Sequence, residues 1–167
     1  MTRIAKLTTA LGLAVLAAGA QAQSIYGEVD YTGLNYKASG LKVKPGMVRG
    51  IVGYEITPNL AVEGMLGLNA SSDSTSGMTA KIDNAIGVFG KAQAPLTDAL
   101  KLYGRVGVVR SSLKVNGSKD NTTDLAYGAG MTYDLSKTTY LNVDYTRYLD
   151  KNSQKLDGVS AGIGFRF

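Results

Sequence analysis

Charged and apolar side chains alternate along the chain with a strictness that constrains its fold more than any other feature. In successive segments after residue 22 every second residue is apolar, which is the period of a β-strand. When each segment is divided by parity, one face is apolar and carries no charge except at strand ends, where Arg110, Lys114 and Arg147 stand. The other face carries Glu28, Asp30, Arg49, Glu55, Glu63, Asp83, Lys91, Lys101, Arg105, Asp134, Asp144 and Arg166. The pattern predicts an all-β fold with one apolar and one charged face.

The expected strands and their connectors alternate in a regular way. We expect eight strands, at about residues 24–36, 47–56, 60–69, 81–93, 100–115, 124–134, 139–149 and 158–167. The short connectors are 57–59, 94–99 and 135–138, and the longer, polar ones are 37–46, 70–80, 116–123 and 150–157. This alternation is typical of bacterial outer-membrane barrels, which have short periplasmic turns and long external loops. An even number of strands places both termini at the short-turn end.

Alternation alone does not say which face points outward. A soluble periplasmic ligand-binding barrel would bury the apolar face, whereas a membrane barrel presents it to lipid. Aromatic residues of the apolar face lie near the strand ends, as membrane interfaces prefer. They are Tyr31, Tyr127 and Tyr145 near the external end, and Tyr54, Tyr133 and Phe167 near the periplasmic end. This distribution favours an eight-stranded antiparallel up-and-down transmembrane β-barrel, and the soluble barrel stays as the alternative.

Glycines on the charged face support the same fold. They are Gly53, Gly67, Gly87, Gly107, Gly128, Gly130, Gly162 and Gly164. An eight-stranded barrel is just wide enough for side chains to fill it, so long charged residues fit inside only where others are small. The other interpretation is that these glycines mark bulges and kinks.

The first 22 residues have the composition of a secretory signal peptide. Arg3 and Lys6 form a basic start, residues 11–20 are apolar, and Ala20-Gln21-Ala22 resembles a cleavage site. Ten apolar residues are too few for a transmembrane helix, because the hydrocarbon core is about 30 Å thick. We therefore expect a signal peptide over 1–22, a barrel domain over 23–167, and export to the outer membrane.

The composition limits the chemistry that this chain can perform. It contains no Cys and no His, so thiol chemistry, disulfides and Ser–His catalysis are excluded. Glu28 and Asp30 form a pair of carboxylates on one face, but no feature of the sequence raises the pKa of either, and lining a lumen is the simpler role. No spacing of acidic residues matches a calcium loop. We expect no enzymatic activity, no metal and no cofactor.

At this level of detail the chain resembles the OmpA-type and OmpX-type outer-membrane barrels. The resemblance covers essentially the whole chain after residue 22, and it is carried by residues 53–64, 89–107, 127–148 and the terminal GIGFRF. In that family a terminal aromatic preceded by alternating apolar residues is the signal that the barrel-insertion machinery reads. The resemblance implies this role for Ala161, Ile163, Phe165 and Phe167, together with passage through periplasmic chaperones. Simple anchoring of Phe167 at the interface is the other interpretation.

The resemblance also implies a cluster of opposite charges in the lumen. Glu63, Lys91, Arg105 and Asp144 match the strand positions of the OmpA-type cluster. Thr132 and Asn142 stand where two further charged partners are expected, which departs from the family pattern. A lumen plugged by paired charges is the expectation, with a structural and surface-interaction role for the protein. The alternative is a narrow pore for ions or small solutes.

The remaining expectations concern partners. Arg110 and Arg147 flank external strand ends, where cations would meet the phosphates of lipopolysaccharide in the outer-membrane lipid. Ordinary solvated charge is the competing interpretation. No basic stripe indicates nucleic acid. We expect a monomer.

Overall fold

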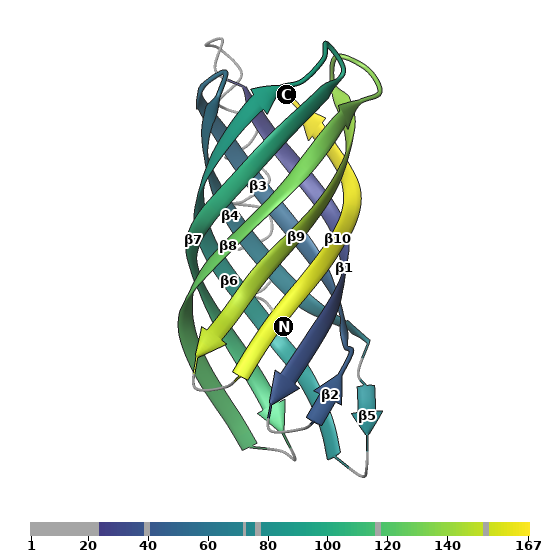
Figure 1. Cartoon of the computed structure of the whole chain (residues 1–167), viewed down its shortest axis with the longest axis vertical. Coiled ribbons are helices and arrows are strands. Elements are labelled where there is room, and N and C mark those ends of the chain that lie inside the picture. Colours follow the sequence, from purple (N-terminus) through teal and green to yellow (C-terminus); the bar gives the residue numbers. More distant parts are fainter. Residues whose placement is uncertain (1–23, 39–40, 72, 76–77, 116–117, 152–153) are drawn as a thin grey trace, which may run out of the picture.

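The protein is a closed antiparallel β-barrel in this computed structural model (Figure 1). The structure describes residues 24–38, 41–71, 73–75, 78–115, 118–151 and 154–167, and every element within these ranges is a strand. No helix among them is long and apolar enough to cross a membrane. The expected signal peptide, residues 1–22, lies outside the described residues.

Eight long strands form the wall. They are β1 (Ile25–Ala38), β3 (Gly46–Thr57), β4 (Leu60–Ser71), β6 (Met78–Pro95), β7 (Leu100–Val115), β8 (Ser118–Asp134), β9 (Thr139–Lys151) and β10 (Gln154–Arg166). Each pairs with the next, and β10 returns to pair with β1 from Tyr26↔Arg166 to Ala38↔Gln154. Two short strands, β2 (Leu41–Val43) and β5 (Asp73–Thr75), pair with β1 and β6. Closure leaves no free edge in the wall, which a bilayer requires.

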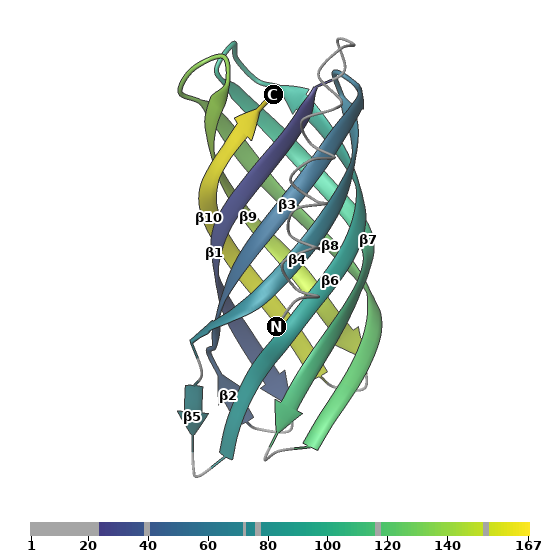
Figure 2. The same cartoon turned by 180° about the vertical axis from the view of Figure 1, so that it is seen from behind.

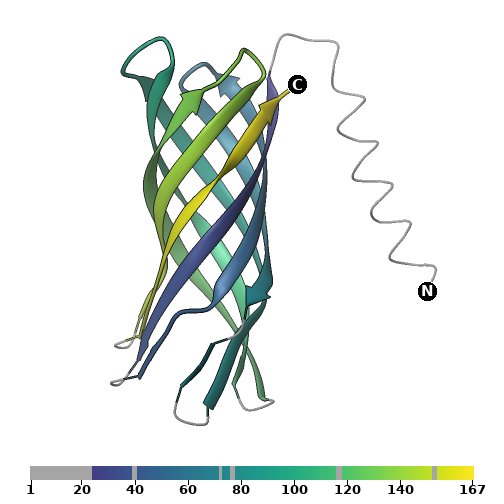
Figure 3. The same cartoon turned by 90° about the vertical axis from the view of Figure 1, so that its right-hand side faces the viewer.

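The two ends of the barrel differ, as the connector lengths predict. The C-terminus and the start of β1 lie at the end that holds the three short turns, and β2 and β5 lie at the opposite end (Figures 1 and 3). We call the short-turn end periplasmic and the opposite end external, following the orientation expected from the sequence. In each short turn a hydroxyl accepts a hydrogen bond from the backbone N–H three residues later, at 3.0 Å. The acceptors are Thr57, Thr97 and Ser136. Such hydroxyl-capped turns are local, which explains why the sequence marks them well.

The strands extend further into the four longer connectors than the approximate predicted bounds. Strand pairing continues through most of 37–46, 70–80, 116–123 and 150–157, and β7 and β8 pair as far as Val115↔Ser118. The apolar–polar alternation that predicts a strand requires two different environments. In these connectors most residues are polar, so the pattern weakens, although the backbone hydrogen bonds between strands continue. The external connectors are therefore mostly extended hairpins.

The apolar face of the wall points outward. Side chains exposed on it include Val29, Val52, Val62, Leu66, Val88, Val106, Leu125, Met131, Val143 and Val159. Soluble monomers rarely expose a continuous apolar band of this size, whereas hydrocarbon requires it. The orientation contradicts the soluble ligand-binding alternative and confirms a transmembrane barrel.

Candidate functional site

The lumen holds large side chains because glycines face them across the strand pairs. Tyr26 lies opposite Gly53, and Tyr140 lies opposite Gly164. A Cβ atom at either glycine would overlap the ring of the opposite tyrosine. Gly87 on β6 serves a neighbouring phenylalanine in the same way, since a Cβ there would lie 2.9 Å from the Phe89 ring. The glycines of the charged face thus make space for lumenal side chains, as the sequence predicts.

A layer of tyrosines lies nearest the periplasmic end. The rings of Tyr26 and Tyr140 meet edge to face, with centroids 6.5 Å apart. The Tyr26 hydroxyl donates to Glu63 Oε1 at 2.7 Å, and the Tyr140 hydroxyl donates to Glu28 Oε1 at 2.9 Å. Lys91 Nζ lies 4.7 Å from the Tyr26 centroid, where the ring attracts the cation. The tyrosines therefore contact both carboxylates and a cation from the periplasmic side of these charges.

The four residues predicted to form a lumenal charge cluster do come together. Lys91 Nζ lies 3.2 Å from Glu63 Oε1, and Arg105 Nη1 lies 3.3 Å from Glu63 Oε2. Arg105 Nη2 lies 3.6 Å from Asp144 Oδ2. None of the four is more than 4% exposed. Four strands, β4, β6, β7 and β9, thus contribute to one buried ion-pair network.

Three further charges complete this network, and the sequence analysis did not include them in it. Glu28 Oε1 lies 3.4 Å from Lys91 Nζ. Arg49 donates from Nε to Asp30 Oδ2 at 2.7 Å, and its other nitrogens pair with Asp144 on the opposite wall. Parity placed these residues on the charged face, but only the register shows that Asp30 and Arg49 are direct cross-strand partners. We call these seven residues the charged layer: Glu28, Asp30, Arg49, Glu63, Lys91, Arg105 and Asp144.

Asn142 contributes to the charged layer without a charge of its own. Its amide nitrogen lies 2.7 Å from Asp30 Oδ1 and 3.4 Å from Glu28 Oε2. The layer contains four carboxylates and three cations, so this donor supports carboxylates that the cations alone do not saturate. Thr132 lies opposite Asn142 and is buried, and its hydroxyl has no hydrogen-bond partner among the described residues. The two departures from the family pattern therefore keep the position polar but uncharged.

An apolar layer fills much of the lumen on the external side of these charges. Its buried members are Leu34, Met47, Ile51, Met65, Ala85, Phe89, Val109, Ala126, Tyr148 and Leu156. The sequence analysis missed this layer, because these residues share parity with the charges and were included in a face regarded as polar. The signal was present in Met47, Phe89 and Val109, which are large and apolar at lumenal positions. The lumen is thus occupied by tyrosines, charges and apolar side chains in succession.

The family of the chain follows from a comparison with family models. The model described as outer membrane protein beta-barrel domain matches residues 8–167. The chain belongs to this family. No curated protein sequence matches the chain.

Solved structures of outer-membrane barrels share this fold. Ail, the attachment invasion locus protein of Yersinia pestis, solved with the heparin analogue sucrose octasulfate, is 18% identical; the match covers 88% of this chain and 100% of Ail, with a TM-score of 0.65. Neisserial surface protein A is 21% identical; the match covers 86% of this chain and 97% of that protein, also with a TM-score of 0.65. OprG of Pseudomonas aeruginosa is 13% identical; the match covers 88% of this chain and 97% of OprG, with a TM-score of 0.61. The family and these neighbours point to the outer membrane.

The predicted interface and terminal residues lie on the lipid-facing side of the barrel. Tyr31, Tyr54, Tyr127, Tyr133 and Tyr145 are all exposed there. Ala161 and Phe165 of β10 are exposed, as is Phe167 directly after this strand, and Ile163 is half-buried. The backbone N–H of Phe167 donates to Ile25 O at 2.9 Å, so the last residue still belongs to the closed wall. Its role as an insertion signal stays a prediction.

The two arginines predicted to contact lipopolysaccharide have different surroundings. Arg147 donates from Nε to Asp157 Oδ1 at 2.7 Å, and its Nη atoms lie 3.5 Å and 3.4 Å from the hydroxyls of Tyr127 and Tyr145. Arg110 is exposed on the same outward face, and no ion pair with another described residue involves it. Arg147 is thus held within a network of protein groups.

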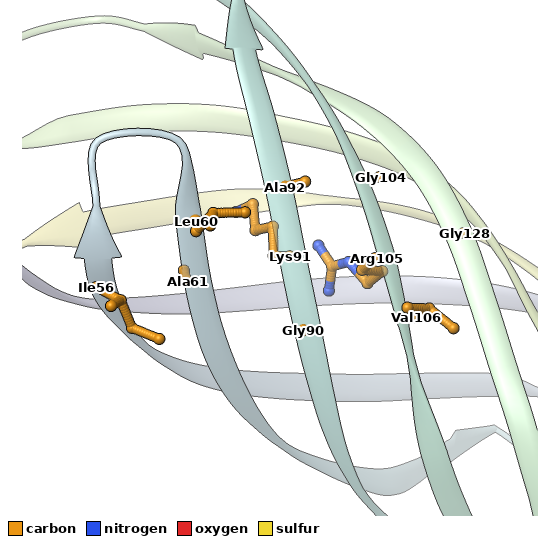
Figure 4. Close-up of a pocket in the computed structure, with 10 residues that line it drawn as sticks. All are labelled: Ile56, Leu60, Ala61, Gly90, Lys91, Ala92, Gly104, Arg105, Val106 and Gly128. Carbon is orange, nitrogen blue, oxygen red and sulfur yellow. The ribbon is translucent and has the colours of Figure 1, made fainter.

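A hollow of about 560 Å³ lies in the wall at the periplasmic end of β3, β4, β6 and β7 (Figure 4). Exposed Ile56, Leu60 and Val106 border it, and Lys91 and Arg105 of the charged layer reach it from the lumen side. A Cβ at Gly90 would make only ordinary contact, 3.9 Å from Val106 O. The hollow therefore reflects small residues in the wall. Across the described chain, no group of three or more acidic, His or Cys residues is placed to hold a metal ion.

Proposed function

We propose that this outer-membrane barrel is closed to ions and solutes, and that its function is carried by its outer surface and external hairpins. The observation that supports this most directly is the filled lumen. Arg49, Glu63, Lys91 and Arg105 are buried at its centre, and Phe89 packs on their external side. Such an interior is structural rather than conductive.

The physical argument concerns what a conducting path would require. An ion would have to separate buried pairs such as Lys91–Glu63 and Arg49–Asp30, and breaking one buried pair destabilises a protein by about 3–5 kcal/mol. It would then have to cross the apolar layer, and hydrophobic constrictions close pores by excluding water. Two successive barriers of different chemistry therefore oppose conduction.

A narrow pore is the second candidate, because several lumenal polar atoms favour it. Arg105 Nε, Thr132 Oγ1 and Asn142 Oδ1 are buried and have no hydrogen-bond partner within the described chain. Buried polar atoms of this kind are usually satisfied by ordered water. Water beside the charged layer would form the first part of a conducting path. Water would also have to enter the apolar layer for this path to be continuous.

We also propose how the protein reaches and occupies the membrane. The exposed terminal aromatic of β10 supports recognition by the barrel-insertion machinery after passage through periplasmic chaperones. Closure of β10 on β1 leaves no unpaired wall strand, which supports a monomer. We expect no catalytic activity, since the sequence offers neither His nor Cys as a base or nucleophile.

An ion-flux measurement tests this function. The barrel is refolded into vesicles with a potassium gradient, and insertion is verified separately by heat-shifted gel migration. The proposal expects the gradient to decay as slowly as in empty vesicles. Faster decay that changes in Lys91→Ala or Arg105→Ala would favour the narrow pore instead.

A further inference from the structure

A pocket lies on the outer surface at the external end of β4, β6, β7 and β8, away from the residues of the charged layer. These strands are neighbours in the wall (Figure 2). The pocket has a volume of about 300 Å³ and is lined by Leu66, Asn84, Ile86, Arg110, Ser112 and Asn121. The strand register places its residues in two adjacent rows, with Leu66, Ile86 and Arg110 in one and Asn84, Ser112 and Asn121 in the other. The pocket is therefore built by paired strands.

The pocket has an apolar half and a polar half. Leu66 and Ile86 are cross-strand partners and continue the lipid-facing band, exposed by 47% and 61%. Arg110 is the cross-strand partner of Ile86 on the other side, so a cation directly borders the apolar surface. In the next row the Ser112 hydroxyl donates to Asn121 Oδ1 at 2.6 Å, which leaves the amide nitrogen of Asn121 as the free donor.

Arg110 is the charge in this pocket that requires a partner. Unlike Arg147, it makes no ion pair with any side chain that the structure describes. An arginine on the lipid face of a barrel costs about 2–4 kcal/mol at the midplane and about 0–1 kcal/mol near the interface. An anion at the interface would satisfy the guanidinium, and its planar donors match a phosphate particularly well.

We propose that this pocket binds a phosphate-bearing lipid of the external leaflet. The phosphate contacts Arg110, with the amides of Asn84 and Asn121 as further donors, and an acyl chain lies along Leu66 and Ile86. The proposal rests on the proposed function, which takes the hairpin end of the barrel as external. Two sources carry the same chemistry, namely the phosphate of lipopolysaccharide and the phosphate of an anionic phospholipid.

Lipid retention tests the proposal. The barrel is refolded in phosphatidylcholine vesicles that contain either lipopolysaccharide or phosphatidylglycerol, extracted in mild detergent, and analysed by native mass spectrometry. We expect wild type to retain one anionic lipid in preference to phosphatidylcholine. Arg110→Gln should reduce that retention about tenfold, the effect of losing one charge-assisted hydrogen bond. Lys155→Gln removes an exposed external cation outside the pocket and is the matched control.

The outcomes separate the site from the function. Retention of one lipid class that is lost in Arg110→Gln and kept in Lys155→Gln supports the site and identifies the source of the phosphate. Equal retention by wild type and Arg110→Gln overturns the site, as does equal loss in both variants. Ion flux through wild type would contradict the closed lumen, but it would leave a selective loss in Arg110→Gln intact.

Discussion

Arg49 links opposite walls of the barrel. Its guanidinium contacts Asp30 on β1 and Asp144 on β9, and Nη1 also donates to the Tyr148 hydroxyl at 3.1 Å. A buried guanidinium is stable only when its donors and charge are satisfied, and here one side chain satisfies two carboxylates. Arg49 therefore joins β1 to β9 through the charged layer, and the sequence analysis did not predict this link.

Removing this link should weaken the barrel strongly. Arg49→Met leaves Asp30 and Asp144 buried without their main partner, and we expect a loss of about 3–5 kcal/mol in the free energy of unfolding. Urea unfolding in detergent, followed by heat-shifted gel migration, measures this loss. Arg166→Met is the control: its pair with Asp134 is partly exposed at the rim, so about 0–1 kcal/mol is expected. Similar losses in both variants would contradict the role of Arg49.

The lumenal glycines give a second comparison at this scale, within one strand. Gly53→Ala places a methyl group against the Tyr26 ring, whereas Gly50→Ala on the lipid face meets only Leu66 O at 3.9 Å. Overpacking typically destabilises a protein by about 1–3 kcal/mol, so Gly53→Ala should lower the unfolding midpoint clearly. Gly50→Ala should leave the midpoint unchanged or raise it. A reversed order, measured by urea titration, would show that the glycines serve the backbone and not the lumenal packing.

Individual lumenal residues could be predicted only in part. Parity placed many charges on one face, and the resemblance to OmpA-type barrels implied that Glu63, Lys91, Arg105 and Asp144 form a lumenal cluster. The contact of Arg49 with both walls could not be predicted, since it depends on the register of three strands and on how far a side chain reaches across the lumen. Parity cannot supply either quantity.

At the scale of elements, β10 has two tasks. It pairs with β9 along one edge and with β1 along the other, so it closes the barrel. It also carries exposed Phe165 on the outward face, and exposed Phe167 directly follows it. Phe167 is 73% exposed, and its backbone N–H, which donates to Ile25 O, ties it to the wall while its ring faces outward. The ring is thus not needed to close the wall, as its proposed role as an insertion signal requires.

Truncating this ring should affect assembly more than stability. We expect Phe167→Ala to slow assembly into vesicles that contain the insertion machinery, and to leave spontaneous folding in detergent nearly unchanged. The assembled fraction is followed over time by heat-shifted gel migration. Tyr133→Ala is the control, because Tyr133 is another exposed aromatic at the periplasmic end. If both variants slow the assisted reaction equally, the ring is an interface anchor and nothing more.

The strands could be predicted from the sequence where their two faces lie in different environments. All eight wall strands were expected, since lipid on one side and a filled lumen on the other impose the alternation. The external hairpins were not, because their pairing rests on backbone hydrogen bonds that leave no apolar pattern in the sequence. β2 and β5 belong to these hairpins and had no counterpart in the prediction.

At the scale of the whole molecule, the barrel is a wall closed around a filled interior. Tyrosines lie at the periplasmic end, the charged layer lies above them, and the apolar layer lies on the external side. Closure was predicted from the alternation of apolar and charged faces, read as a membrane barrel, and from the resemblance to small outer-membrane barrels. The sequence did not predict the apolar layer, because a lumen was taken to be polar throughout. Both layers together argue for a sealed barrel.

Single-channel recording tests this central claim most directly. Wild-type barrel is inserted into a planar bilayer, currents are recorded at several salt concentrations, and insertion is shown separately by heat-shifted migration. The filled lumen predicts a silent bilayer at every salt concentration. Reproducible discrete conductance that changes in Lys91→Ala or Arg105→Ala would contradict it, and would make this barrel a narrow pore with a charged gate.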